Sequence, residues 1–392
     1  MDLAYLLSLE LPICKVSDSP SNIPSIQHWT SLQHNLRAQL QDVDDPGWSL
    51  NVLRRVGGLD ISFETGTTGT NRATAVLVVC ELTVNQVNDE NEGTASAMTE
   101  IYEDAVDVDM DLPYISGFLF VREVFAYELL LQRLRKSAPE LEPDVFLVDG
   151  SGVFHPRQCG SASHFGISNG LRTIGVAKKL LCFDDFDKAA GEQVEQHMLC
   201  NFGDNIPLVG SSGFVYGLAL RTAHPAKDTS SKRIYVSIGN GFCLESTKDV
   251  ILKCCDVGGS YLPEPVRLAD LTGRAIERTC KQIHQMQPGP EARQIAIDIS
   301  NLLSNKSRKT LLDMLEEVSL DLHQRLASVQ PESLKRKRST VEELFLPLQG
   351  MYPEAQVGVL LAALRIEKPW AANLHKECLC KQRAGEAMRV AL

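Results

Sequence analysis

Long hydrophobic runs are missing from this sequence of 392 residues. No segment reaches the roughly 18 to 20 apolar residues that a membrane-spanning helix needs, which excludes a protein of that class. The N-terminal MDLAYLLSLELPICK has no basic segment ahead of its apolar residues, so it does not predict a signal peptide. The eleven cysteines lack the spacing of metal ligands and are interpreted as free thiols in a reducing compartment. We therefore expect a soluble protein of the cytoplasm, the nucleus or both, with no membrane partner.

Positive charge is scarce overall, but its distribution is uneven. The formal net charge is −11. Residues 86–111 carry nine carboxylates and no lysine or arginine, whereas residues 155–182 carry only basic charges. Because salt screens charges beyond about 8 to 10 Å, a local basic face can bind phosphate on an acidic protein. The composition therefore does not exclude a nucleic-acid partner, although it predicts weak non-specific binding.

Alternation of apolar residues and turn signals predict an α/β domain over residues 29–282. The expected strands are 56–63, 72–82, 100–108, 144–150, 173–181, 214–222 and 232–240, the last two as a pair. The expected helices are 31–43, 121–139, 244–255 and 263–279. Three early strands, a helix, and then strands alternating with helices indicate a mixed central β-sheet flanked by helices.

The segments outside this pattern are harder to interpret. Residues 1–28 are poorly patterned, and residues 86–111 form an acidic insertion with a loop or hairpin tip at 85–97. Residues 283–392 are interpreted as a linker and a helical or partly disordered C-terminal extension, which contains a KRKR run at 335–338. That run is typical of a nuclear-import signal, an RNA-contacting tail or a charge cluster at a helix end. The partner of this extension is unknown.

Three carboxylates stand at positions where the pattern predicts burial. Asp60 lies within the apolar strand VGGLDISF, Asp149 ends the run FLVD, and Glu123 begins the long helix. An unpaired carboxylate among apolar neighbours is costly, whereas Mg²⁺ and Mn²⁺ favour hard oxygen ligands. Each acid alone could be a cap or an ion-pair partner. Together, with glycines beside Asp60 and Asp149, they predict a metal-dependent site.

Six blocks, in order over about residues 30–280, resemble the endonuclease V family. They are VGGLDISF (56–63), PYISGFLFVREV (113–124), PDVFLVDGSGVFHPR with GSASHFGI (143–167), TIGVAKKLL (173–181), GLALRT (217–222) and YLPEPVRLAD (261–270). The resemblance implies an RNase H-like fold and a metal-dependent nuclease that cuts near inosine. A eukaryotic type with a C-terminal extension is the closest description, because residues from about 283 lie outside the family core.

The resemblance also implies roles for individual residues. It assigns Mg²⁺, with Mn²⁺ as a substitute, to Asp60, Glu123 and Asp149, and makes Lys178 the active-site lysine. The residues implied to line the pocket of an extruded base are Gly117, Leu119, His155 and Gly160, with Tyr114 as the wedge beside it. Gly150, which lacks a side chain, is expected to let the backbone approach the same base. From the residues alone, Tyr114 could be a packed loop aromatic, His155 a turn cap and Lys178 part of a solvated pair. Arg157 stays open between a phosphate contact and a structural ion pair.

The segment VSIGNGF departs from the family pattern. It has Asn240 where the family usually has histidine, and asparagine cannot take up a proton. Activity would then be weaker or more dependent on Mn²⁺, or His164 or His224 would supply the imidazole. An alternative follows: a protein that binds inosine-containing RNA with little or no catalysis because of Asn240.

The sequence therefore predicts a monomeric endonuclease that acts on inosine-containing nucleic acid. By resemblance it would hydrolyse the phosphodiester on the 3′ side of inosine, one nucleotide beyond it. The products would carry 3′-hydroxyl and 5′-phosphate ends. RNA is favoured over DNA, with single-stranded RNA as substrate and deaminated DNA as a second one. A general RNase H-like nuclease would leave PYISG and VDGSGVFHPR unexplained.

Overall fold

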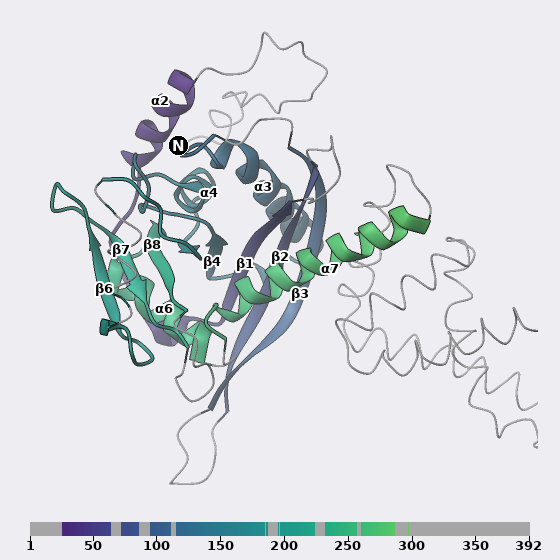
Figure 1. Ribbon diagram of the computed structural model, residues 1–392. Coiled ribbons are helices and arrows are strands. Elements are labelled where there is room, and N and C mark those ends of the chain that lie inside the picture. The colour runs from purple at the N-terminus through teal and green to yellow at the C-terminus, as the bar shows by residue number, and fades with distance from the viewer. Residues whose placement is uncertain are drawn as a thin grey trace, which may run out of the picture. The chain divides into compact units, whose positions relative to one another are not determined.

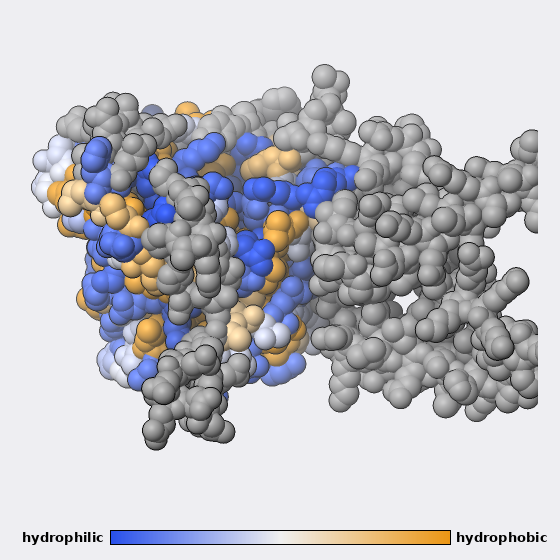
Figure 2. Space-filling view, turned by 60° about the horizontal axis from the view of Figure 1, so that its bottom comes forward, coloured by the Kyte–Doolittle hydropathy of each residue, from blue (hydrophilic) through white to orange (hydrophobic). Residues whose placement is uncertain are grey.

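The computed structural model describes residues 26–63, 72–85, 95–110, 115–184, 186, 195, 197–223, 232–256, 260–286 and 297. The chain divides into two compact units, residues 1–270 and 271–392. Tyr114, His224, the loop predicted before residue 95 and the KRKR run lie outside the described residues. No described helix is long and apolar enough to cross a membrane. On the face that Figure 2 shows, hydrophilic and hydrophobic residues are interspersed in small patches.

An eight-stranded mixed sheet forms the centre of the first unit (Figure 1). Its strands are β1 (Arg55–Phe63), β2 (Arg72–Asn85), β3 (Ala95–Asp109), β4 (Val145–Asp149), β5 (Thr173–Ala177), β6 (Asn205–Val209), β7 (Val215–Leu220) and β8 (Ile234–Asn240). Their order is β3-β2-β1-β4-β5-β8-β7-β6. Strand β4 pairs in parallel with β1 on one side and with β5 on the other. Strand β2 pairs antiparallel with β1 and β3, and β8 pairs antiparallel with β5. This is the RNase H-like α/β arrangement that the resemblance implied, and the predicted fold class is confirmed.

Helices cover both faces of this sheet. They are α2 (Ile26–Arg37), α3 (Phe120–Ser137), α4 (Ser161–Asn169), α6 (Leu244–Asp256) and α7 (Glu264–Met286), with short 3₁₀ turns at Leu50–Val52 and Pro139–Leu141. On one face, Leu59 and Phe146 pack with Tyr127 of α3 and Phe165 of α4. On the other face, Val56 and Val145 pack with Val250 of α6 and Val266 of α7. Burial of each such side chain contributes about 1.5 to 3 kcal/mol relative to exposure, which holds the layers together.

Alternation along the strands decides which side chains face α6 and α7. Successive strand residues point to opposite faces, so Asp60 shares the face of Val56, and Asp149 shares that of Val145. Lys178 continues the same parity from Ile174 and Val176 of β5. The three polar side chains therefore project from the sheet on the side that α6 and the start of α7 cover.

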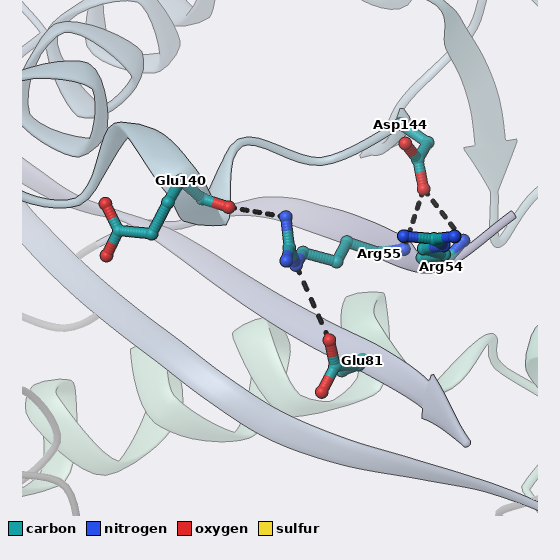
Figure 3. Close-up of polar contacts among 5 residues, drawn as sticks. All are labelled: Arg54, Arg55, Glu81, Glu140 and Asp144. Carbon is teal, nitrogen blue, oxygen red and sulfur yellow. Dashed lines mark hydrogen bonds and ion pairs between the residues drawn. The ribbon is translucent and has the colours of Figure 1, made fainter.

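Polar contacts at the start of β1, at the end of the strand away from Asp60, fix the register of β1, β2 and β4 (Figure 3). The Asp144 carboxylate accepts hydrogen bonds from the backbone N–H groups of Arg54 (2.8 Å) and Arg55 (2.9 Å). The Arg55 side chain donates to the carbonyl of Glu140, and its Nε lies 3.6 Å from Glu81 Oε1. Because β1 and β4 are tied together at their starts, Asp60 and Asp149 arrive side by side near their ends.

Gly58 allows α7 to approach β1. A Cβ atom at this position would lie 2.2 Å from the backbone carbonyl of Pro265, closer than any side chain tolerates. The second glycine of VGGLD is therefore explained by close packing of the first turn of α7 on β1. This contact brings α7 onto the face from which Asp60 projects.

The seven strands and four helices predicted between residues 29 and 282 are all present, although some begin or end at other residues than predicted. The helix expected over 31–43 ends at Arg37, and the strand expected over 173–181 ends at Ala177. The short helix α4 and the edge strand β6 were not predicted. Strand β3 takes up residues 95–109 of the acidic segment, so most of its acids belong to the sheet and not to an insertion. Arg133 pairs with Asp104 at 2.7 Å, and Arg72 pairs with Asp107, which accounts for acids in that strand.

Candidate active site

Three adjacent parallel strands deliver Asp60, Asp149 and Lys178 to one place. The register pairs Leu59 with Val148, so Asp60 and Asp149 occupy corresponding positions on β1 and β4. Asp149 in turn pairs with Val176, two residues before Lys178. Since parallel strands end at the same edge of a sheet, residues separated by more than a hundred positions become neighbours.

Asp270 joins this cluster from α7. Carboxylate oxygens of Asp60, Asp149 and Asp270 all lie within 4.8 Å of one another, and this is the one such group among the described residues. Asp60 and Asp270 are buried and Asp149 is partly buried. We did not predict Asp270 as a site residue. The sequence feature that could have identified Asp270 is its place at the end of YLPEPVRLAD, a block that resembles the family. No role was assigned to the acid of that block.

Lys178 connects the three carboxylates. Its Nζ lies 2.6 Å from Asp149 Oδ2, 2.7 Å from Asp270 Oδ1 and 3.6 Å from Asp60 Oδ1. Burial alone would lower the pKa of Lys178, but the charges of Asp149 and Asp60 raise it overall. Burial, together with the hydrogen bond and charge of Asp149, raises the pKa of Asp60 well above its ordinary value. Lys178 therefore stays charged, and a further positive charge near Asp60 would be stabilised.

Glu123 lies beyond this group, on the face of the sheet that α3 covers. It is buried in the first turn of α3. Burial and the charge of Asp149 raise the pKa of Glu123 to about 8, although a hydrogen bond from Ser161 acts against the shift. Its Oε2 atom is buried and has no hydrogen-bond partner among the described residues. A buried carboxylate oxygen without a partner close to Asp149 is a position that a cation would satisfy.

The donors of this cluster fit a hard divalent cation. Among the residues that the structure describes, all candidate ligands are carboxylate oxygens, the class that Mg²⁺, Mn²⁺ and Ca²⁺ prefer. The orphaned Oε2 of Glu123 and the raised pKa of Asp60 indicate an uncompensated need for positive charge. The site could therefore hold a metal ion, with Asp60, Asp149 and Asp270 as the group that the geometry brings together.

Two of the residues predicted to line a base pocket, Gly117 and His155, meet at one carbonyl group. His155 Nε2 donates to the Gly117 carbonyl at 3.0 Å, and Arg157 Nη2 donates to the same oxygen at 2.5 Å. Gly117 has φ +79°, in the left-handed region that favours glycine. Gly160 caps α4 and donates its N–H to Gly152, while Gly150 donates to Val176 beside Asp149. Leu119 caps α3 two residues after Gly117.

Both ring nitrogens of His155 are occupied within the protein. Nε2 faces the Gly117 carbonyl, and Nδ1 accepts the backbone N–H of Arg157 at 3.2 Å. These partners assign the proton to Nε2. Burial and the charge of Arg157 lower the pKa of His155 to about 4, so the ring is neutral at physiological pH. His155 can form a wall of a pocket, but neither ring nitrogen is available to a ligand in this arrangement.

Arg157 also belongs to this internal network. Its Nε donates to Gln33 Oε1 at 2.5 Å, and its guanidinium carbon lies 4.1 Å from the centre of the Phe118 ring. These contacts are hydrogen bonds and a cation–π interaction, not the ion pair that the sequence left open. They favour a structural role over contact with phosphate.

Asn240 lies at the wrong edge of the sheet for the role that the sequence suggested. It pairs with Thr173 at the start of β5, whereas Lys178 follows the end of that strand. Five residues of strand separate the two positions by about 16 Å. Its Oδ1 accepts from Gln41 N at 3.0 Å, and its Nδ2 donates to Leu171 O at 2.9 Å. Asn240 therefore joins two loops, and the expectation that it replaces an active-site imidazole is wrong.

His164 is buried in α4, with its ring 4.8 Å from that of Phe120. Burial lowers the pKa of His164 to about 4. The structure therefore gives this imidazole the environment of a packed core residue.

Comparisons with known proteins agree with this geometry. A model of the endonuclease V family matches residues 34–271. The chain is 40% identical over 260 residues to Endonuclease V of Mus musculus, covering 65% of this chain and 70% of that protein. It is 38% identical over 250 residues to Endonuclease V of Homo sapiens, covering 63% of this chain and 81% of that protein.

Solved structures show the same likeness. A crystal structure of human ENDOV is 37% identical with a TM-score of 0.56, covering 66% of this chain and 100% of that chain. Ciona intestinalis Endonuclease V, in complex with a 24mer DNA containing an inosine followed by a ribo-adenosine, is 29% identical. Its TM-score is 0.54, and the match covers 67% of this chain and 99% of that chain.

Proposed function

The chain belongs to the endonuclease V family, and from this premise we propose that it cuts inosine-containing single-stranded RNA. As a family member it is an endonuclease, an enzyme that hydrolyses phosphodiester bonds. The observation that carries the proposal is the convergence of Asp60, Asp149, Asp270 and Lys178 at one edge of the sheet. The proposed cut lies on the 3′ side of inosine, one nucleotide beyond it. Deaminated DNA is proposed as a second substrate.

Two features support a substrate with inosine and a ribose. The related Ciona protein was crystallised with DNA in which a ribo-adenosine follows the inosine. In the present chain, His155 bonds to the Gly117 carbonyl, and the segment that carries His155 begins with Gly150, directly after Asp149 in sequence. A base removed from its stack would enter between segments that include Gly117, Leu119, Gly150, His155 and Gly160, with Tyr114 as the proposed wedge.

The carboxylates are proposed to hold Mg²⁺, with Mn²⁺ as a substitute. Asp60, Asp149 and Asp270 would be its ligands, and the free Oε2 of Glu123 is suited to a second contact. When bound, such an ion offsets charge on phosphate oxygens and makes a coordinated water more acidic. The three carboxylates would hold the ion at this edge of the sheet.

Lys178 is proposed to act as a fixed positive charge. Because the charges of Asp149 and Asp60 raise its pKa, the ammonium keeps its proton and is a poor general acid. It can instead orient the attacking water or hold a non-bridging phosphate oxygen. In the reaction, the water oxygen bonds to phosphorus and gives up a proton to solvent, while the P–O3′ bond breaks. The electron pair of that bond remains on O3′, which takes up a proton from solvent and leaves as the 3′-hydroxyl.

The alternative of an inosine-RNA binding protein without catalysis loses its basis. It rested on Asn240 of β8, whose partner Thr173 lies five residues, about 16 Å, before Lys178 along the neighbouring β5. The carboxylates and Lys178 remain in contact with one another. We propose that the enzyme acts as a monomer in the cytoplasm, the nucleus or both.

A cleavage assay on matched oligonucleotides tests the proposal. Single strands of RNA and DNA, identical except for inosine or adenosine at one position, would be incubated with the protein in Mg²⁺ or Mn²⁺. The proposal expects cutting of the inosine strands only, faster on RNA, with 3′-hydroxyl and 5′-phosphate ends. Equal cutting of inosine and adenosine strands would refute the base selectivity, and equal rates on RNA and DNA would refute the RNA preference.

A further inference from the structure

A fully buried amide on α2 joins the two segments around the proposed base pocket. Gln33 is 0% exposed. Its Nε2 donates to the Cys159 carbonyl at 2.7 Å and lies 3.4 Å from the Gly117 carbonyl. Its Oε1 accepts from Arg157 Nε at 2.5 Å. One side chain thus bonds to the segment before α3 and to the segment before α4, which lie more than 40 residues apart in sequence.

The Gly117 carbonyl is the point at which this network closes. It accepts hydrogen bonds from His155 Nε2, Arg157 Nη2 and Gln33 Nε2. A Cβ atom at Gly117 would lie 2.9 Å from Arg157 Nη2, so a side chain there would displace the guanidinium from this network. The carbonyl is therefore held toward the protein interior, and its direction sets the backbone orientation of the loop that leads to Leu119.

Apolar contacts dock α2 without the help of Gln33. Trp29 and Leu36 are buried on the same helix, and the Trp29 ring lies 5.8 Å from that of Phe118. The Phe118 ring in turn stacks under Arg157. These apolar contacts hold α2 on the protein, so the hydrogen bonds of Gln33 are not needed to dock the helix. They instead orient the backbone carbonyls and the guanidinium to which the amide bonds, which apolar contacts cannot do.

We propose that Gln33 is a positioning residue for base recognition, which holds the Gly117 and Cys159 segments at the spacing that admits inosine. This inference rests on the proposed function, because it assumes that the pocket between these segments takes the base. Gln33 lies just outside residues 34–271, which the family model matches. It acts through Gly117, Arg157 and His155, and does not itself touch the base.

Two substitutions separate positioning from folding. Gln33→Met keeps the length and volume of the side chain but removes all its hydrogen bonds. Gln33→Glu keeps the acceptor for Arg157 but cannot donate to the Cys159 or Gly117 carbonyls. Gln27→Met is the matched control, because Gln27 is exposed on the same helix. Thermal unfolding of each variant establishes that it is folded before its activity is compared.

The main readout is discrimination between inosine and guanosine, which differ by an amino group on the base. In Gln33→Met, the ratio of kcat/KM for inosine RNA to that for guanosine RNA should fall about 10- to 100-fold, the scale of a misplacement of about 1 Å. The loss should appear in KM for inosine more than in kcat, since the carboxylates are untouched. In Gln33→Glu the inosine-to-guanosine ratio should fall to a similar extent, and in Gln27→Met it should equal that of the native protein.

Nitrogen NMR of the His155 ring gives a second readout that needs no substrate. In the native protein it should show one tautomer, with the proton on Nε2, and in Gln33→Met a mixture of tautomers. If the native protein selects inosine but folded Gln33→Met keeps the same ratio and the same His155 spectrum, the positioning role is overturned. If the native protein does not select inosine, the proposed function fails, and the NMR comparison still decides whether Gln33 positions His155 and Gly117.

Discussion

Lys178 Nζ lies 2.6 Å from Asp149 Oδ2, an ion pair between the ends of two neighbouring parallel strands. The same ammonium lies 2.7 Å from Asp270 Oδ1 on α7. The lysine therefore compensates an acidic cluster to which β1, β4 and α7 each contribute one carboxylate. A cation held by the same oxygens would share this task, so the lysine and the metal are coupled.

Replacing Lys178 tests that coupling. In Lys178→Met, the partly buried carboxylates lose their compensating charge, which should destabilise the metal-free protein by up to about 3 kcal/mol. Added Mg²⁺ should therefore raise the unfolding temperature more in the variant than in the native protein. Cleavage should fall by about 100-fold or more, because a fixed charge near the phosphate is lost.

The neighbouring Lys179 provides the control for this experiment. Its side chain is exposed, so Lys179→Met should change neither the stability nor the effect of Mg²⁺. If both variants respond to Mg²⁺ as the native protein does, the coupling between Lys178 and the metal site is wrong.

Asp270→Asn removes one charge from the cluster while keeping its shape. We expect cleavage to fall by about 100-fold or more, as it should in Asp149→Asn, because both residues are proposed ligands of one ion. The concentration of Mg²⁺ that gives half-maximal cleavage should rise in both variants. Native-like cleavage and metal dependence in Asp270→Asn would remove this residue from the site.

Asn240→His should not raise activity. An imidazole cannot reproduce both the bond from Gln41 N and the bond to Leu171 O without moving one of these loops. Loss of a buried hydrogen bond costs about 1 to 3 kcal/mol, so we expect lower stability in chemical denaturation and unchanged or lower cleavage. A gain in cleavage rate would instead show that position 240 reaches the substrate.

Stability should decrease in mild acid because of His155. Burial lowers the pKa of His155 from 6.5 to about 4, so between these values the unfolded chain binds a proton that the folded chain does not. The contribution of the neutral His155 ring to the free energy of unfolding is complete above pH 6.5. It is lost as the pH falls toward about 4, by about 3 kcal/mol at most. Denaturant unfolding between pH 7 and pH 5 should show a smaller decrease in His155→Gln. An equal decrease in both proteins would contradict the assigned cause.

The strand residues of the site could be predicted because burial and charge conflict there. Asp60 and Asp149 stand in apolar strands, where a carboxylate needs a specific reason, and the structure brings these two together with Lys178. Asp270 could not be recognised in the same way, because an acid in an amphipathic helix is typical of a solvent-facing position. The contact of Gly58 with Pro265 and the packing of Val266 show that this part of α7 faces the sheet.

The position of Asn240 could not be predicted for a different reason. Strand β8 runs antiparallel to β5, so its last residue reaches the edge opposite Lys178. The hydrophobic pattern identifies a strand but not its direction relative to its neighbours. Helix α4 was missed because SASHFGISN has no clear apolar period, and β6 because Pro207 argues against a central strand; it is an edge strand.

The most direct test of the central claim is single-turnover cleavage of inosine-containing RNA by the native protein and by Asp149→Asn. With Mg²⁺ present, the native protein should cut the strand one nucleotide beyond the inosine. It should stop cutting when the metal is chelated and resume when the metal is restored. Asp149→Asn should bind the same strand and leave it intact. Cleavage by Asp149→Asn at the native rate, or metal-independent cleavage by the native protein, would contradict the assignment of the active site to this edge of the sheet.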